Sequence, residues 1–163
     1  MKLPQIIPHK IFTLYELLQE VSRQRLKSKT IAFTNGCFDI LHQGHIASLS
    51  EAAAEADFLI VGVNADQSVR KLKGEHRPVN DERSRAILLA SLLMVDAVVI
   101  FGEDTPLELI KAIMPDVLVK GGDYTLEQIV GAKEVVAGGG RVVINPLVPG
   151  FSTTGLIDTI MVV

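Results

Sequence analysis

The chain has 163 residues, of which 48% are hydrophobic and 21% charged, as is typical of one globular domain with a single core. Its formal net charge of -3 argues against non-specific binding to nucleic acid or to anionic membranes, so neither is expected as a partner. With a single cysteine, Cys37, no internal disulfide can form. The first ten residues do not resemble a signal peptide, and no apolar run approaches the ~20 residues that span a bilayer, so a cytoplasmic protein is expected.

Short apolar runs alternate with helical patterns along the chain. Strands are predicted over residues 30–34, 58–63, 97–101, 117–119 and 141–144. Because these runs are apolar on both faces, they favour the buried strands of a parallel sheet. Helices are predicted over residues 14–25 (behind a Thr13 cap), 45–56, 82–94, 105–114 and 126–137. The alternation predicts a single α/β domain with a Rossmann-like, doubly wound parallel five-stranded sheet, in which residues 1–27 form a helical extension and 28–160 the catalytic core.

Polar residues and glycines follow all five predicted strands. These strand ends comprise residues 35–39, 64–66, 102–104, 120–123 and 145–146. Ligands of doubly wound sheets bind beyond the carboxyl ends of the strands, so the functional site is expected there. The first strand end carries the strongest pattern and continues into the next predicted helix.

The segment from Thr34 to His45 reads TNGCFDILHQGH. Gly36 allows a tight turn and a close approach of the backbone to a ligand. A helix is predicted to begin near Gly44, and its free N–H groups and dipole favour an anion such as a phosphate. Because His42 and His45 are three residues apart, both imidazoles can lie on one side of that helix start. There they can donate hydrogen bonds to oxygens that gain charge during phosphate transfer.

An alternative interpretation of this segment is a zinc site formed by Cys37, His42 and His45. The sequence has no second cysteine and no pair of histidines at His-x-x-x-His spacing to support it. Phosphate binding is therefore favoured, and no residue of the chain is assigned as a metal ligand.

The pattern Gly36-x-Phe38-Asp39-x-x-His42-x-Gly44-His45 resembles the signature of the cytidylyltransferase-like nucleotidyltransferases. Further segments resemble one branch of that superfamily, the D-glycero-β-D-manno-heptose 1-phosphate adenylyltransferases. They are 63–66 (VNAD), 72–74 (LKG), 77–80 (RPVN), 95–96 (VD), 118–124 (LVKGGDY) and 152–154 (STT). The His-x-Gly-His element specifies only the superfamily, whereas LKG, RPV and KGGDY together point to the heptose branch.

The resemblance implies transfer of AMP from ATP to the sugar 1-phosphate, with Mg²⁺ accompanying the triphosphate. It implies that His42 and His45 stabilise the α-phosphate in the transition state, with Lys73 as a third catalytic residue. Lys73 and Arg85 would both neutralise phosphate charge. The other residues expected to contact the nucleotide are Thr34, Asn35, Gly36, Cys37, Phe38, Asp39, Gly44, Gly121, Asp123, Ser152, Thr153 and Thr154. Those expected to bind the acceptor are Asn64, Asp66 and Lys71.

Several of these residues also have simpler structural interpretations. The run 152–154 makes a good helix N-cap. Lys71 and Lys73 fit a solvated basic loop equally well, and Asp123 fits a turn after two glycines. Asp66 either caps a short helix or positions the sugar or Mg²⁺.

Partners are also implied by the resemblance. The heptose enzymes of the family often belong to a two-domain protein that includes a sugar kinase, for which 163 residues are too few. A functional link to a separate sugar kinase is therefore expected. The apolar run 160–163 is expected to pack on the core or on a second subunit, and a homodimer is predicted.

The residues leave other functions open. No nucleophile–base arrangement of the hydrolase kind is visible, so a sequential mechanism without a covalent intermediate is expected. A second candidate is another nucleotidyltransferase acting on a polyol phosphate, such as glycerol 3-phosphate with CTP. A third is a non-catalytic nucleotide-binding module. A dinucleotide-dependent oxidoreductase is disfavoured because the first turn lacks Gly-x-Gly-x-x-Gly.

Overall fold

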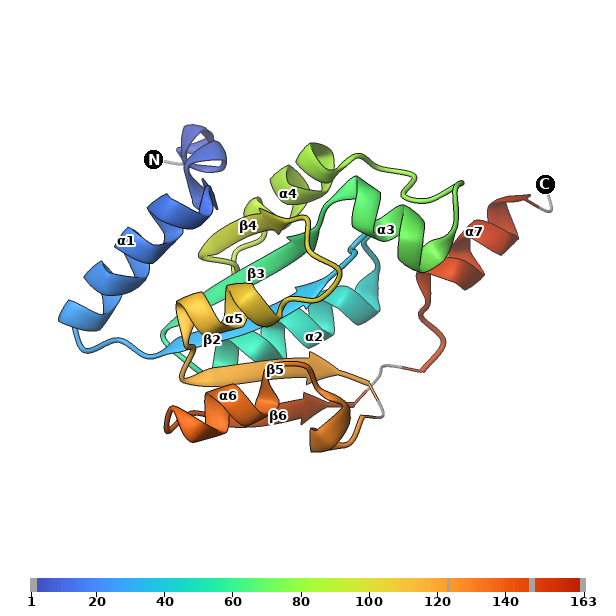
Figure 1. The fold of residues 1–163 in the computed structure, drawn as a ribbon. Helices are drawn as coiled ribbons and strands as arrows, with labels where there is room; N and C mark the ends of the chain where they lie inside the picture. The colour runs from blue at the N-terminus through green and yellow to red at the C-terminus, as the bar shows by residue number, and fades with distance from the viewer. Residues whose placement is uncertain (1–2, 123, 147–148, 162–163) are drawn as a thin grey trace.

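The computed structural model describes residues 3–122, 124–146 and 149–161. Its centre is one sheet of six parallel strands in the order β1-β4-β3-β2-β5-β6 (Figure 1). The strands are β1 (Ile11–Phe12), β2 (Ile31–Gly36), β3 (Phe58–Asn64), β4 (Ala97–Phe101), β5 (Val117–Gly121) and β6 (Arg141–Asn145). The predicted Rossmann-like α/β fold is confirmed, with one strand more than expected.

The additional strand, β1, lies at one edge of the sheet. Its two residues pair in parallel with β4, Ile11 with Val98 and Phe12 with Val99. The prediction of five strands is therefore wrong, because two residues are too few for hydrophobic periodicity to reveal. The segment ahead of the first long strand thus supplies a strand of the sheet as well as a helix.

Seven α-helices connect or flank the described strands. They are α1 (Leu14–Leu26), α2 (Gln43–Ala54), α3 (Asp66–Lys73), α4 (Glu82–Ala90), α5 (Leu107–Ile113), α6 (Ala132–Ala137) and α7 (Thr153–Met161). The single helix predicted over 126–137 is wrong, because a 3-10 turn, η3 (Leu126–Gln128), is separated from α6 by extended backbone at Ile129 and a left-handed Gly131. Further 3-10 turns are η1 (Pro4–Ile6) and η2 (Pro8–Lys10).

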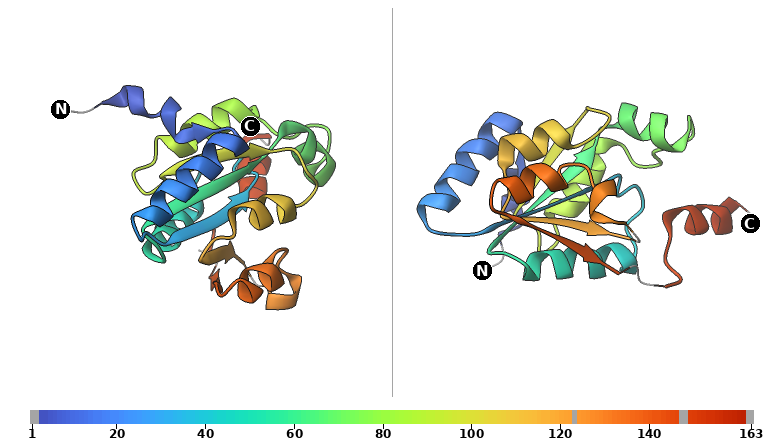
Figure 2. Two further views of the ribbon diagram at one scale, coloured as in Figure 1. Left: turned by 60° about the vertical axis from the view of Figure 1, so that its left-hand side comes forward. Right: turned by 60° about the horizontal axis from the view of Figure 1, so that its bottom comes forward.

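The helices cover both faces of the sheet (Figures 1 and 2). Buried residues of α1, α5 and α6, among them Leu17, Ile110 and Val135, pack with Phe33 on one face. Leu49 of α2, together with residues of α4, packs on the other face. This two-sided burial explains why the strands are apolar on both faces. No described helix is long and apolar enough to cross a membrane.

The carboxyl ends of the strands all lie at one edge of the sheet, as parallel pairing requires. The turn from β2 into α2 lies at this edge, as do α3 and the segment that follows it. Helix α7 lies beyond the same edge, apart from the two helical layers (Figures 1 and 2). Residues from distant parts of the sequence thus meet around the end of β2.

Candidate active site

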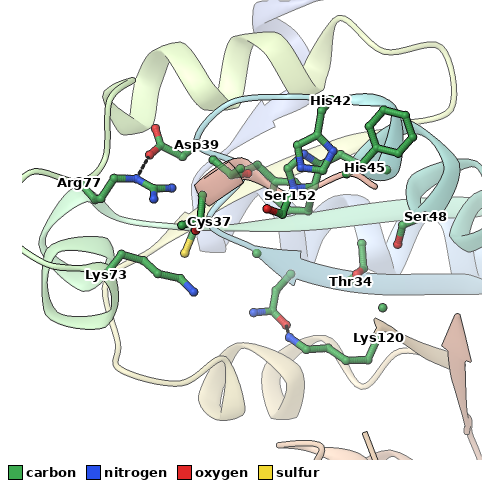
Figure 3. A pocket seen from close by; sticks show the side chains of 18 of the residues that line it. Thr34, Cys37, Asp39, His42, His45, Ser48, Lys73, Arg77, Lys120 and Ser152 are labelled. Carbon is green, nitrogen blue, oxygen red and sulfur yellow. Dashed lines mark hydrogen bonds and ion pairs between the residues drawn. The ribbon is translucent and has the colours of Figure 1, made fainter. Parts of the chain in front are cut away.

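A cavity of about 450 Å³ opens at the carboxyl ends of β2 and β5 (Figure 3). The residues predicted from sequence that line it are Thr34, Asn35, Gly36, Cys37, Phe38, Asp39, His42, Gly44, His45, Lys73, Gly121, Ser152, Thr153 and Thr154. Residues that the sequence analysis did not assign to the site also line it: Ser48, Arg77, Lys120, Tyr124, Pro146 and Phe151. One cavity therefore joins the ends of two strands, the start of α2 and the segment leading into α7.

His42 and His45 lie against each other at the N-terminal end of α2 (Figure 3). Their ring centroids are 3.9 Å apart, with the planes inclined by 23°, and Phe38 contacts His45 edge-on at 5.3 Å. The Nδ1 atom of each histidine is buried, and no described residue hydrogen-bonds to it. Buried polar nitrogens ordinarily have partners. These two are therefore candidates for contact with a bound ligand.

Gly44 allows the two rings to pack so closely. A Cβ atom at Gly44 would lie 3.1 Å from the ring of His42 and 3.1 Å from the Cβ of Phe151. His42 is the N-cap residue, with extended backbone, and its carbonyl oxygen accepts the amide hydrogens of His45 and Ile46 at 2.9 and 3.2 Å. The His-x-Gly-His element thus folds as a helix start with both imidazoles on one side, as the spacing predicts.

Both imidazoles are less basic than an ordinary histidine. Burial lowers the pKa of His42. Burial, followed by the neighbouring His42, lowers the pKa of His45 to about 4. At pH 7 the rings are therefore mainly neutral, and each carries one N–H donor. A neutral stacked pair avoids like-charge repulsion and keeps donors that can stabilise a phosphate oxygen as it gains charge.

The titration of His45 tests this electrostatic description. We expect its imidazole to titrate near pH 4 in the free protein and at higher pH once α,β-methylene-ATP binds, because a nearby anion favours the protonated ring. Since the folded-state pKa lies below the unfolded value, the contribution of His45 to stability falls as the pH drops from about 6.5 towards 4. Imidazole ¹⁵N chemical shifts measure the titration. An ordinary histidine pKa that nucleotide does not move would contradict the description.

Asp39 fastens the loop after β2 to the segment that follows α3. Its side chain is 1% exposed. One carboxylate oxygen accepts the amide hydrogens of Val79 and Asn80 at 2.7 and 3.0 Å, and the other accepts from Arg77 Nε. The Asn80 amide group donates in return to the backbone oxygen of Asp39 at 2.7 Å. These contacts hold Arg77 beside the cavity, so the buried aspartate of the motif positions a cation.

Replacing Asp39 by asparagine is expected to destabilise the protein by about 2 kcal/mol at pH 7. The new side-chain NH2 group would face N–H groups that now donate to the carboxylate, so at least one hydrogen bond would be lost. Burial raises the pKa of Asp39, but hydrogen bonds from Asn80, Arg77 and Val79 outweigh it, so the pKa is lowered overall. A lowered carboxyl pKa contributes stability above about pH 4 that is lost as the pH falls further. The difference in the free energy of unfolding between wild type and D39N, measured by urea unfolding, should therefore become smaller as the pH falls below about 4. A difference independent of pH would refute this assignment.

Arg85 does not reach the cavity that the phosphates were predicted to occupy. Its side chain is 0% exposed. Its guanidinium donates to the backbone oxygens of Cys37 at 2.6 Å and Asn80 at 2.9 Å, and to the carboxylate of Asp66 at 2.7 Å. All three acceptors belong to segments around the strand ends. In this structure the Arg85 side chain therefore joins these segments beneath the site, and its contact with a phosphate stays a prediction.

The three residues predicted to bind the acceptor also lie outside the lining of the cavity. The buried side-chain amide of Asn64 donates to Ser68 Oγ at 3.1 Å. Asp66 pairs with the buried Arg85. Lys71 is exposed and pairs with Asp104 at 2.9 Å. Asp123, predicted to contact the nucleotide, lies outside the described residues.

Three cationic side chains line the cavity: Lys73 at the end of α3, Arg77 in the following segment, and Lys120 in β5 (Figure 3). Lys120 is partly buried, and burial lowers its pKa. Arg77 and Lys120 belong to the RPVN and LVKGGDY segments, but no functional role was predicted for either residue from the sequence. The position of Lys120 could have indicated a role in the site, because it directly precedes the two glycines at the end of a predicted strand.

The donor set of the cavity bears on metal binding. Among the described residues, no three His, Cys, Asp or Glu side chains gather as a group that could hold a metal ion. The alternative zinc site of Cys37, His42 and His45 is therefore unsupported. The cavity is instead rich in N–H donors and cations, which suit phosphate oxygens.

Comparison with known proteins agrees with this chemistry. The cytidylyltransferase-like family model matches residues 33–158. The bifunctional protein HldE of Rhodopseudomonas palustris (strain BisB5) is 57% identical over 143 residues, covering 88% of this chain and 29% of that protein. HldE of Koribacter versatilis is 56% identical over 149 residues, covering 91% of this chain and 31% of that protein. The chain thus spans about three tenths of the length of these relatives.

Solved structures share the fold. A lipopolysaccharide core biosynthesis protein from Thermoplasma volcanium has a TM-score of 0.59 at 29% identity, over 74% of this chain and 97% of that one. A pantoate-β-alanine ligase from Francisella tularensis has a TM-score of 0.59 at 17% identity, over 91% of this chain and 76% of that one, and supports the fold alone. Since the family model covers most of the chain and includes the histidine pair, the chain belongs to the cytidylyltransferase-like family of nucleotidyltransferase enzymes.

Proposed function

We propose that this protein transfers AMP from ATP to D-glycero-β-D-manno-heptose 1-phosphate, forming ADP-heptose and pyrophosphate. The observation that carries the proposal is the pair of mainly neutral, stacked imidazoles at the start of α2, facing a cavity lined by cations. Such donors suit a phosphate whose oxygens gain charge during transfer. The acceptor is supported by the similarity to HldE proteins and to a lipopolysaccharide core biosynthesis protein, together with the KGGDY, LKG and RPV segments.

The proposed chemistry is a direct displacement at the α-phosphorus of ATP. An oxygen of the sugar phosphate attacks the α-phosphorus of ATP. A bond forms between this oxygen and the α-phosphorus, and the bond between the α-phosphorus and the departing pyrophosphate breaks. The attacking phosphate is already ionised at neutral pH, so it needs no general base. His42 and His45 donate to the oxygens of the α-phosphate, while Lys73 and Arg77 draw the charge of the departing pyrophosphate. Mg²⁺ would enter with ATP and neutralise the triphosphate.

This function needs a supply of sugar 1-phosphate. We propose a functional link to a sugar kinase, since transfer of a phosphate to a sugar is the reaction that yields such an acceptor. The bifunctional nature of the HldE relatives, which extend well beyond the region matched by this chain, supports that link.

One assay tests the proposal. The protein is incubated with Mg²⁺, either ATP or CTP, and either heptose 1-phosphate or glycerol 3-phosphate, and products are identified by mass spectrometry. We expect ADP-heptose and pyrophosphate from the ATP and heptose 1-phosphate pair alone. A CDP-linked product would favour a cytidylyltransferase, and nucleotide binding without any product would favour a non-catalytic module.

A further inference from the structure

A second, smaller cavity adjoins the active-site cavity at the end of β5. It has a volume of about 200 Å³ and shares Asn35, Lys120 and Tyr124 with the larger cavity. Its other lining residues include Leu118 of β5 and Gln128 of η3. The shared residues thus lie where one cavity passes into the other, and the proposed chemistry assigns no role to the smaller cavity.

Lys120 is the charged residue at this passage. Its ammonium nitrogen lies 3.5 Å from the side-chain oxygen of Asn35 and 5.9 Å from the centre of the Tyr124 ring. Neither partner carries a compensating negative charge. Burial also makes the charge costly, as the lowered pKa of Lys120 shows. A partly buried lysine whose contacts with Asn35 and Tyr124 are both to neutral groups is well suited to bind an anion that supplies the missing charge.

The cations of the active site stand on different sides of the cavity. Lys73 and Arg77 come from α3 and the segment after it, whereas Lys120 extends from the end of β5 (Figure 3). Transfer between two phosphates places the entering and leaving oxygens in line, on opposite sides of the phosphorus under attack. The acceptor phosphate therefore needs a cation separate from those that bind the departing pyrophosphate.

We propose that Lys120 binds the phosphate of the acceptor and that the adjoining cavity receives the sugar. The proposal rests on the proposed function, because it names the acceptor side of the same site. The cavity offers the chemistry that a sugar needs. The ring of Tyr124 provides an apolar face, and the amides of Asn35 and Gln128 can hydrogen-bond to hydroxyl groups. Gln128 is held in place because its side-chain oxygen accepts the amide hydrogen of Thr125 at 2.9 Å.

The test replaces Lys120 by methionine, which keeps a long unbranched side chain and removes its charge. We expect the KM for heptose 1-phosphate to rise by about tenfold to a hundredfold, as for loss of a charge-assisted hydrogen bond. The KM for ATP should stay within about a factor of two. Lys133→Met is the matched control, because Lys133 is an exposed lysine of α6 that lines neither cavity. Removing a partly buried charge that has no ion-pair partner among the described residues should not lower stability, so K120M should melt at or above the wild-type temperature.

A second measurement on the wild type does not depend on the variant. Lysines are acylated with acetic anhydride at limiting reagent, and modification at each position is read by peptide mass spectrometry. We expect heptose 1-phosphate to protect Lys120 and α,β-methylene-ATP alone to leave it reactive. Protection by the nucleotide alone, or a K120M enzyme that loses affinity for ATP and keeps it for the acceptor, would overturn the proposal. So would a K120M enzyme with both KM values unchanged.

Failure of the two proposals can be told apart. If the wild type uses glycerol 3-phosphate and not heptose 1-phosphate, the proposed function falls. The same two measurements, made with glycerol 3-phosphate, then decide the role of Lys120. If ADP-heptose forms and K120M behaves like K133M, the function stands and the role of Lys120 falls. A wild type that uses neither acceptor removes both.

Discussion

Replacing either His42 or His45 by alanine is expected to leave a folded protein whose turnover is lower by about a hundredfold or more. Removing one donor that is aimed at developing charge typically costs about 3 kcal/mol of transition-state stabilisation. The folded state should persist, because the Nδ1 atoms of both rings are buried without a partner among the described residues, so no hydrogen bond there is lost. The loss should appear in kcat, because the donors act as charge develops.

Initial rates of pyrophosphate release, with both substrates varied, measure this effect. His9→Ala is the matched control, because His9 is exposed in η2, outside the cavity lining. Circular dichroism and thermal melting verify that each variant is folded. A folded H42A or H45A enzyme with wild-type kcat would remove the histidine pair from the mechanism.

Replacing Arg85 by methionine is expected to lower the free energy of unfolding by about 3–5 kcal/mol, the typical cost of removing one partner from a buried charge network. The variant leaves the carbonyl oxygens of Cys37 and Asn80 without their donor and Asp66 without its counter-charge. Because Cys37 belongs to the turn between β2 and α2, the remaining folded protein should also bind ATP less tightly.

Urea unfolding at pH 7 measures the first effect, and calorimetric titration with α,β-methylene-ATP measures the second. Arg83→Met provides the comparison, since Arg83 is an exposed arginine on the same helix, α4. If R85M and R83M have the same stability and the same nucleotide affinity, Arg85 has no positioning role. An R85M protein with normal stability and lost affinity for the nucleotide would instead support the direct contact between Arg85 and a phosphate that the sequence predicted.

The fold was predictable where a single physical signal dominated. Strands β2 to β6 are apolar on both faces, and that pattern predicts a parallel sheet covered by helices. The pairing of Ile11 and Phe12 with β4 depends on tertiary contact, and a segment of two residues is too short for the sequence pattern to predict it. The break before α6 was also missed, because helical periodicity continues through Gly131, whose left-handed backbone interrupts the helix.

The site was predictable for residues close together in sequence. The turn from Thr34 to His45 folds as expected, because its glycines and its histidine spacing act locally. The placement of Arg85 was not predictable, because a charged residue at a helix start ordinarily faces solvent. Only the fold brings Cys37, Asn80 and Asp66 around its guanidinium.

Long-range packing likewise determines which cations reach the cavity. Lys71 and Lys73 are two residues apart on α3, yet Lys73 lines the cavity and Lys71 pairs with Asp104. Lys120 reaches the cavity because β5 pairs beside β2. Strand order of this kind is a property of the folded sheet, so composition and spacing along the chain cannot supply it.

A crystal structure of the protein with α,β-methylene-ATP and Mg²⁺ tests the central claim most directly. The account predicts that a ring nitrogen of both His42 and His45 lies within about 3.2 Å of oxygens on the α-phosphate, at the start of α2. A triphosphate bound elsewhere, with the two rings turned away from it or coordinating a transition-metal ion, would contradict the account.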